Sequence, residues 1–233
     1  MKSLFRVFFL MMAAVFIALP SGHASPVDSV DESYDFHKIK NVMIYDIDLS
    51  SQTSLTASDI TSLQQNFRMQ AEKLLEIPSL DKVKLNRKIS LAIGKDLDVI
   101  EKNNPDEYAT LVNDNLRVVA DIYVKSELVE YSIGTYTIPA HTDWKTVTDY
   151  DTYRDKDGHT HTVSRERTIP VYVPEQHGPY THVKMRFSSY DTTTGKVIFT
   201  REEIREEDNS RDCLDTYNKI VRSYFRDLRK KIK

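Results

Sequence analysis

Two strand-like segments separated by a long insertion constrain the fold of this chain more than any other feature. Residues 180–190 alternate apolar and polar side chains, as expected for a strand with one buried and one wet face. Residues 121–133 form the other segment, and a third strand at 196–200 follows a turn at 191–195. The residues between the first two strands, 134–179, must leave the sheet and return to it.

The segment at 121–133 changes the phase of its alternation. Ile122, Val124 and Leu128 share one face, whereas the apolar residues from Val129 to Ile133 occupy the opposite face. A period of two cannot place both sets in one core. Either a bulge lies near Leu128, or the strand leaves the main core where the insertion begins. We favour the second interpretation.

The insertion itself is typical of a β-ribbon. Residues 144–154 and 159–173 are two arms around the sequence Asp-Lys-Asp-Gly at 155–158, and Asp-Gly between extended segments is a strong hairpin signal. Pro170, Pro174 and Pro179 would interrupt pairing with further strands. We therefore predict an edge ribbon within residues 134–179.

Helical patterns flank the strands. A capping-box pattern at Thr56 and Asp59 begins one helix, and Pro78 marks its end. Asn104 followed by Pro105 begins a second. The third, capped by Ser210, carries a wide apolar stripe through residues 214–232.

These elements predict an α+β fold, an α/β sandwich in which a mixed sheet is covered mainly on one face by three helices. The apolar run at residues 42–47 suits a central strand. Val83 and Leu85 alternate with charged neighbours and indicate a short edge strand, and residues 96–102 suit a helical turn. We expect residues 41–233 to form a single domain carrying the ribbon.

The first 24 residues have the pattern of a secretory signal peptide. A basic start precedes an apolar run at residues 7–19, and small residues lead to Ala24. The run is shorter than the roughly 20 residues that a membrane span needs. We expect cleavage after Ala24, no membrane span afterwards, and a flexible lead-in at residues 25–40.

Net charge and cysteine content disfavour nucleic-acid binding, an internal disulfide and lipid attachment. Cleavage removes two basic residues and no acid, which changes the net charge from −3 to −5 and disfavours nonspecific nucleic-acid binding. The only cysteine, Cys213, cannot form an internal disulfide, and the signal segment has no cysteine for lipid attachment. The sequence predicts an exported protein of the periplasm or cell envelope.

Catalytic and metal-binding patterns are sparse. His159 and His161, two apart on a predicted strand, would project from one face and could share a metal. No third ligand is identifiable from spacing, and the common hydrolase and phosphate-loop motifs are absent from the sequence. We predict no cofactor and no enzyme activity. A metal-dependent envelope enzyme built on these histidines is the alternative.

Aromatic side chains in the insertion are the most suggestive functional feature. Tyrosine and tryptophan in a polar ribbon are common at recognition surfaces. Alternatively, they pack the ribbon onto the sheet. Long insertions in compact domains are usually functional, which favours recognition. The candidate binding residues are Tyr136, Trp144, Tyr150, Tyr153 and Tyr172.

The order of elements resembles small α/β domains of secreted and lipid-anchored bacterial envelope proteins: curli-secretion accessory proteins, penicillin-binding-protein activators and the TolB amino-terminal domain. The resemblance spans residues 40–230. It rests on Asn41-Val42-Met43-Ile44-Tyr45 before a helix, Val119-Ala120-Asp121-Ile122-Tyr123-Val124 as a strand, the turn and strand of residues 191–199, and the helix of residues 210–233.

This resemblance implies a noncatalytic envelope role and carries no active-site residues. The chain differs from those proteins in lacking a lipid-attachment cysteine and in its aromatic ribbon. We therefore predict a binding or assembly accessory protein whose ribbon holds an envelope protein or a second copy of itself. A glycan- or peptidoglycan-binding module that uses the same ribbon is a further alternative.

Overall fold

The computed structural model describes residues 25–233, so the predicted signal peptide at residues 1–24 lies outside the described residues. The described chain divides into two compact units. The first, here called the body, contains residues 25–134 and 180–233. The second, here called the ribbon, contains residues 135–179. Strands β4 and β7 run from one unit into the other.

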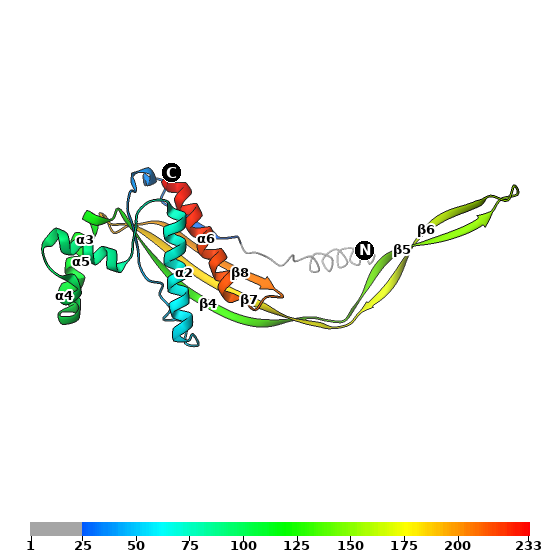
Figure 1. Cartoon of the computed structure of the whole chain (residues 1–233), viewed down its shortest axis with the longest axis horizontal. Helices are drawn as coiled ribbons and strands as arrows, with labels where there is room; N and C mark the ends of the chain where they lie inside the picture. Colours follow the sequence, from blue (N-terminus) through cyan, green and yellow to red (C-terminus); the bar gives the residue numbers. More distant parts are fainter. Residues whose placement is uncertain (1–24) are drawn as a thin grey trace, which may run out of the picture. The chain divides into compact units, whose positions relative to one another are not determined.

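The body is built on a six-stranded sheet with the order β1-β8-β7-β4-β2-β3; Figure 1 labels its strands β4, β7 and β8. Strand β2 is parallel to β3 and β4, whereas β8 is antiparallel to β1 and β7. The sheet is therefore mixed, and the predicted α+β class is confirmed. The strands are β1 Val27–Val30, β2 Val42–Ile44, β3 Ser79–Leu80, β4 Ile122–Ile138, β7 Gln176–Asp191 and β8 Val197–Asp208.

The helices begin at residues whose side chains cap them. Thr56 and Asp59 form both halves of the predicted capping box. Asn104 caps the helix that starts at Pro105, as predicted. The helical elements are η1 Phe36–Lys38, α2 Ala57–Leu75, α3 Lys82–Ile93, α4 Leu97–Asn103, α5 Pro105–Val119 and α6 Cys213–Ile232.

Helix α6 begins two residues later than predicted. Asp212, not Ser210, is its cap, and the Asp212 side chain accepts a hydrogen bond from the backbone N–H of Asp215 at 3.0 Å. The Ser210 hydroxyl instead accepts from the backbone N–H of Asp212 at 3.2 Å. Serine and aspartate are both strong caps, so composition alone does not choose between them.

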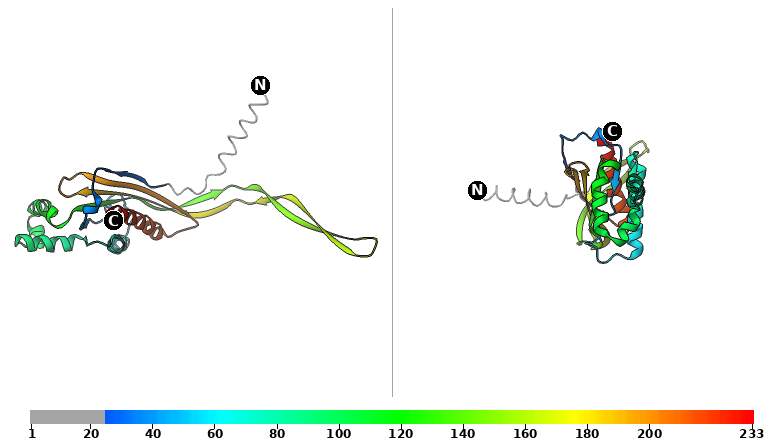
Figure 2. Two further views of the ribbon diagram at one scale, coloured as in Figure 1. Left: turned by 90° about the horizontal axis from the view of Figure 1, so that it is seen from above. Right: turned by 90° about the vertical axis from the view of Figure 1, so that its left-hand side faces the viewer.

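Helices α2 and α6 cover one face of the sheet and bury the main core. In the left view of Figure 2 both lie on the same side of β7 and β8. Alternate residues of β7 point into this core, among them Phe187, whose ring stacks on Tyr224 with centroids 4.1 Å apart. The Tyr224 hydroxyl lies 2.7 Å from the Ser189 hydroxyl, which satisfies both buried groups.

Helices α3, α4 and α5 build a second core against the other side of β2. Its buried members include Met43 on β2, Leu85 and Ile89 on α3, and Leu116 on α5. Helix α5 thus packs here and not beside α2 and α6. Among the described residues, no helix is both long and apolar enough to cross a membrane.

The edge strand predicted at Val83 and Leu85 is wrong, because this segment lies in α3. Asp81 caps the helix by accepting from the backbone N–H of Lys84 at 2.8 Å. Val83 is 71% exposed, whereas Leu85 and Ile89, four residues apart, are buried on one helical face. Two alternating residues are too few to distinguish a period of two from a period of 3.6.

The segment predicted as a flexible lead-in contains an edge strand. Strand β1 pairs with β8, which continues to Asp208, beyond the strand predicted at residues 196–200. The guanidinium of Arg201 is 3% exposed, and its Nη2 lies 2.7 Å from Asp28 of β1 and 2.9 Å from Asp227 of α6. Burial alone would lower the pKa of Arg201, but these two carboxylates hold it above its ordinary value.

Replacing Arg201 with methionine is expected to lower the free energy of unfolding by about 2–4 kcal/mol, because Glu203, 1% exposed, would keep only Arg205 as a partner. Urea unfolding at neutral pH measures this loss. The matched control is Arg186→Met, which removes a half-exposed arginine and should change the free energy by less than about 1 kcal/mol. Equal losses for the two variants would contradict a stabilising role for the buried network.

Candidate functional site

The predicted hairpin is confirmed in the ribbon. Strands β5 His141–Arg154 and β6 Thr160–Val173 form a two-stranded antiparallel sheet (Figure 1). In the turn, the backbone N–H of Gly158 donates to the carbonyl of Asp155 at 3.1 Å. Gly158 has a φ of +85°, which disfavours any residue with a side chain.

Cross-strand pairing places the ribbon's side chains on two chemically different faces. Directly paired residues lie on the same face, and successive residues of a strand alternate between faces. One face, here called the aromatic–threonine face, is exposed at every position. It consists of Thr142, Trp144, Thr146, Thr148, Tyr150, Thr152 and Arg154 on β5, and Thr160, Thr162, Ser164, Glu166, Thr168, Pro170 and Tyr172 on β6.

The opposite face, here called the charged–aliphatic face, mixes ion pairs with aliphatic side chains. Arg167 and Asp149 form an ion pair there at 2.5 Å. Val147, Ile169 and Val173 on this face are partly buried. Its members are His141, Asp143, Lys145, Val147, Asp149, Asp151 and Tyr153 on β5, and His161, Val163, Arg165, Arg167, Ile169, Val171 and Val173 on β6.

Three of the five predicted binding residues share the aromatic–threonine face. Trp144, Tyr150 and Tyr172 are 71%, 71% and 70% exposed. Tyr172 pairs with Thr142, so it is a diagonal neighbour of Trp144, and such neighbours lie about 7–8 Å apart. Tyr150 lies farther along the same face.

The other two predicted binding residues lie elsewhere. Tyr153 is on the charged–aliphatic face and stacks on the His161 ring with centroids 5.3 Å apart. Tyr136, in the ribbon part of β4, covers Gly178: a Cβ at that glycine would lie 2.4 Å from the Tyr136 hydroxyl oxygen. The Tyr136 ring therefore lies against the backbone of β7 at Gly178.

The two histidines proposed as weak metal ligands contact one carboxylate. Asp155 Oδ2 lies 2.7 Å from His161 Nε2 and 3.6 Å from His159 Nδ1. The hydrogen bond with His161 is the main reason that the pKa of Asp155 is below its ordinary value. Within residues 25–233, no group of three or more histidine, cysteine, aspartate or glutamate side chains is placed to hold a metal ion.

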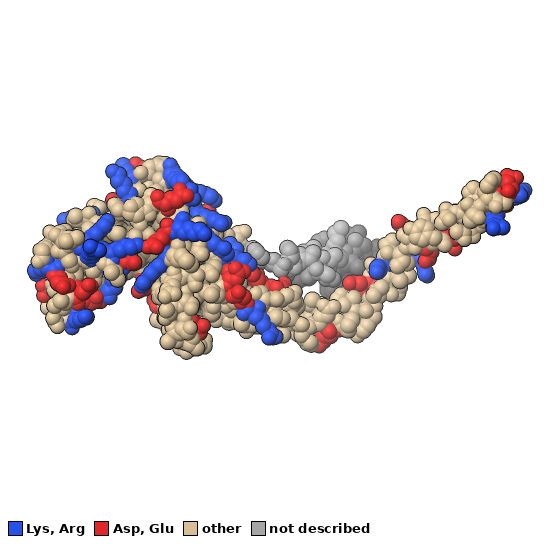
Figure 3. Space-filling model, viewed as in Figure 1, with Lys and Arg blue, Asp and Glu red and all other residues tan. Residues whose placement is uncertain are grey.

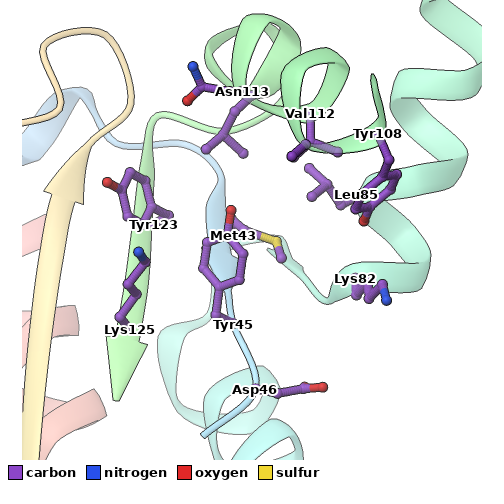
Figure 4. Close-up of a pocket in the computed structure, with 12 residues that line it drawn as sticks. Met43, Tyr45, Asp46, Lys82, Leu85, Tyr108, Val112, Asn113, Tyr123 and Lys125 are labelled. Atoms are coloured by element: carbon purple, nitrogen blue, oxygen red, sulfur yellow. The ribbon is translucent and has the colours of Figure 1, made fainter. Parts of the chain in front are cut away.

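The body contains a cavity that the sequence did not reveal. Its volume is about 490 Å³, and it lies between strands β2 and β4 on one side and helices α3 and α5 on the other (Figure 4). Tyr45, Tyr108 and Tyr123 line it, although they are far apart in the sequence. No motif in the sequence connects these positions.

Comparisons with known proteins find likenesses among solved structures. No family model and no curated protein matches the chain. The solved structures that match include the PelC dodecamer from Paraburkholderia phytofirmans and a variant dodecamer of the same protein. Each is 9% identical with a TM-score of 0.41, over 88% of this chain and 96% or 97% of the other. Likeness this distant carries no inference about the present protein.

Replacing His161 with phenylalanine is expected to raise the pKa of Asp155 toward its ordinary value near 3.8, because the carboxylate loses its strongest hydrogen-bond partner. A carbon-13 NMR titration of the aspartate carboxyl groups measures the change. Tyr153→Phe, which keeps the ring stacked on His161, should leave this pKa where it is. An unchanged value in the His161 variant would show that the turn amides alone hold the carboxylate ionised.

Proposed function

We propose that this protein is an exported, noncatalytic binding or assembly module of the cell envelope. Its aromatic–threonine face contacts the surface of a protein partner, either another envelope protein or a second copy of this chain. The observation that carries the proposal is the collection of Trp144, Tyr150 and Tyr172 on one fully exposed face.

The composition of this face suits protein recognition. Tryptophan and tyrosine contribute most of the binding energy in many interfaces, because they bury large area with few rotatable bonds. The threonines between them are stiff at χ1, and each hydroxyl can both donate and accept a hydrogen bond. A partner therefore meets a preorganised surface and orders few side chains on binding.

The dimensions of the ribbon also favour a protein. Each strand has 14 residues, so the face is at most about 45 Å long. Among residues 25–233, strands β5 and β6 pair only with each other, which leaves their outer backbone edges for strand addition. In the view of Figure 3, most of the visible ribbon surface is neither acidic nor basic.

The two-stranded architecture of the ribbon supports an assembly role. An isolated two-stranded hairpin is marginal in water, since it buries little apolar surface. A partner that covers the exposed aromatic rings would stabilise the ribbon and itself at the same time. Binding and not catalysis fits such an open surface, because catalytic groups generally act in a water-excluded site.

The decisive experiment is an affinity pulldown from envelope extract with a triple variant, Trp144→Thr, Tyr150→Thr and Tyr172→Thr. Threonine keeps the strand propensity and the character of the face. The matched control changes three residues of the opposite face, Tyr153→Thr, Val163→Thr and Val171→Thr. We expect the first variant to lose the partners of the natural protein and the control to retain them.

Sedimentation velocity on the same two variants tests self-association. If the partner is a second copy, the aromatic variant should sediment as a smaller species than the control. If the aromatic variant keeps both the pulldown partners and the sedimentation coefficient of the natural protein, the proposal is refuted.

Deletion of residues 140–175 is expected to leave the body folded, because neither hydrophobic core contains a residue of the ribbon. The free energy of unfolding should change by less than about 1 kcal/mol, or a few degrees in Tm. Circular dichroism melting measures this. Loss of cooperative unfolding would show that the ribbon is part of the folding unit of the body.

A glycan is the second candidate ligand, favoured by the diagonal placement of Trp144 and Tyr172. Aromatic rings in this arrangement can stack on neighbouring sugar units. Trp144 is the only tryptophan, so its fluorescence reports directly on this site. Saturable quenching by peptidoglycan fragments, abolished in a variant that keeps Trp144 but carries Tyr150→Thr and Tyr172→Thr, would favour the glycan over a protein partner.

A further inference from the structure

The cavity of the body has the size and lining of a small-molecule site. Its volume of about 490 Å³ falls within the range typical of ligand pockets, roughly 300–1,000 Å³. All of its lining residues belong to the body, so it is a different site from the aromatic–threonine face.

Apolar side chains form the base of the cavity and the wall on the helix side. Met43 of β2 lies at the base, Leu85 comes from α3, and Val112 and Leu116 come from α5 (Figure 4). All four belong to the second core and are nearly inaccessible. This part of the cavity offers a ligand dispersion contacts and no hydrogen bonds.

Three tyrosines line other parts of the cavity. Tyr45 and Tyr123, on neighbouring strands, meet edge to face with centroids 5.7 Å apart. Tyr108 stands on the helix side, and its hydroxyl donates to Asn86 Oδ1 at 3.0 Å. Burial raises the pKa of all three hydroxyls, so they stay protonated and uncharged at neutral pH.

Lys125 places a cation at the aromatic edge of the cavity. Its Nζ lies 5.9, 5.7 and 5.9 Å from the ring centroids of Tyr45, Tyr123 and Tyr190, a distance at which the rings attract the ammonium. Tyr190 fixes the orientation of Tyr123 by stacking on it at 4.7 Å. The ammonium of this exposed lysine therefore lies near three aromatic rings.

The other two charged groups of the lining already have partners. Lys82 Nζ lies 2.5 Å from Glu101, and Asp46 is paired with Arg68. Lys125 forms no ion pair with any residue of the described chain from 25 to 233. An anionic group on a ligand would thus find one uncommitted cation, next to hydroxyl donors and an apolar base.

We propose that this cavity binds a small amphiphilic carboxylate, with its apolar body against Met43 and Val112 and its carboxylate on Lys125. A cationic ligand would meet the ammonium groups of Lys82 and Lys125. A fully polar ligand would leave hydrogen-bonding groups unsatisfied against the apolar wall. An acyl chain and an aromatic ring system both satisfy the description, and the experiment distinguishes them.

Isothermal titration calorimetry with two matched pairs of probes tests the proposal. Octanoate and 1-octanol represent the acyl class, whereas 2-naphthoate and 2-naphthol represent the aromatic class. We expect one molecule of carboxylate to bind per chain, at least about tenfold more tightly than the neutral probe of the same shape, because a charge-assisted hydrogen bond contributes in this range. If octanoate binds more tightly than 2-naphthoate, the ligand is an acyl carboxylate; if 2-naphthoate binds more tightly, the ligand is an aromatic carboxylate.

Two variants and a control locate the site. Lys125→Met should remove the preference for the carboxylate, and Val112→Trp should abolish binding of both probes by filling the cavity. Lys73→Met, an exposed lysine of α2 outside the lining, should bind as the natural protein does. Thermal melts establish that each variant is folded. If the Val112 variant is unfolded, the loss or survival of the carboxylate preference in the Lys125 variant tests the proposal by itself.

Two results would overturn the proposal. One is that neither carboxylate binds, or that the neutral probes bind as tightly as the carboxylates. The other is that the preference for the carboxylate survives in the Lys125 variant, which would place the binding site elsewhere.

Discussion

Burial of one face of the sheet beneath α6 is the interaction on which the rest of the structure depends. Phe187, Phe199 and Tyr224 are fully buried, and the two phenylalanine rings both stack on Tyr224. Burying each large side chain stabilises the fold by roughly 1.5–3 kcal/mol. A one-residue slip of β7 against β8 would turn Lys184 and Arg186 inward, so the same contacts specify the register of the sheet.

Helices α2 and α6 pack on one face of the sheet, so the opposite face of β2 and β4 is available for a second core and a cavity. Helices α3 to α5 cover only part of it, with Met43 at the centre of a second core. The tyrosines beside that core border a cavity where a closed core would place aliphatic side chains. The same strand alternation that buries Val124 in the main core therefore presents Tyr123 and Lys125 to this cavity.

Much of the local structure followed from the sequence. The hairpin at Gly158, the capping box at Thr56 and the start of α5 at Pro105 depend on contacts within a few residues. The prediction of an edge strand at Val83 and Leu85 was wrong because two alternating residues fit both the strand period of two and the helical period of 3.6. The strand that begins at Val27 was not predicted, because the contacts that stabilise it are distant in sequence. Asp28, for example, accepts hydrogen bonds from the guanidinium of Arg201. Long-range ion pairs leave no local pattern to detect.

The sequence by itself determined the α+β class and the position of the ribbon, because periodicity and turn chemistry are properties of neighbouring residues. It also located the aromatic residues of the ribbon. Only the tertiary structure decided that Trp144, Tyr150 and Tyr172 share one face, that Tyr136 covers Gly178, and that a lysine and several tyrosines enclose a cavity. These depend on register and on packing between distant segments, which the chain acquires only when its strands pair and its helices dock.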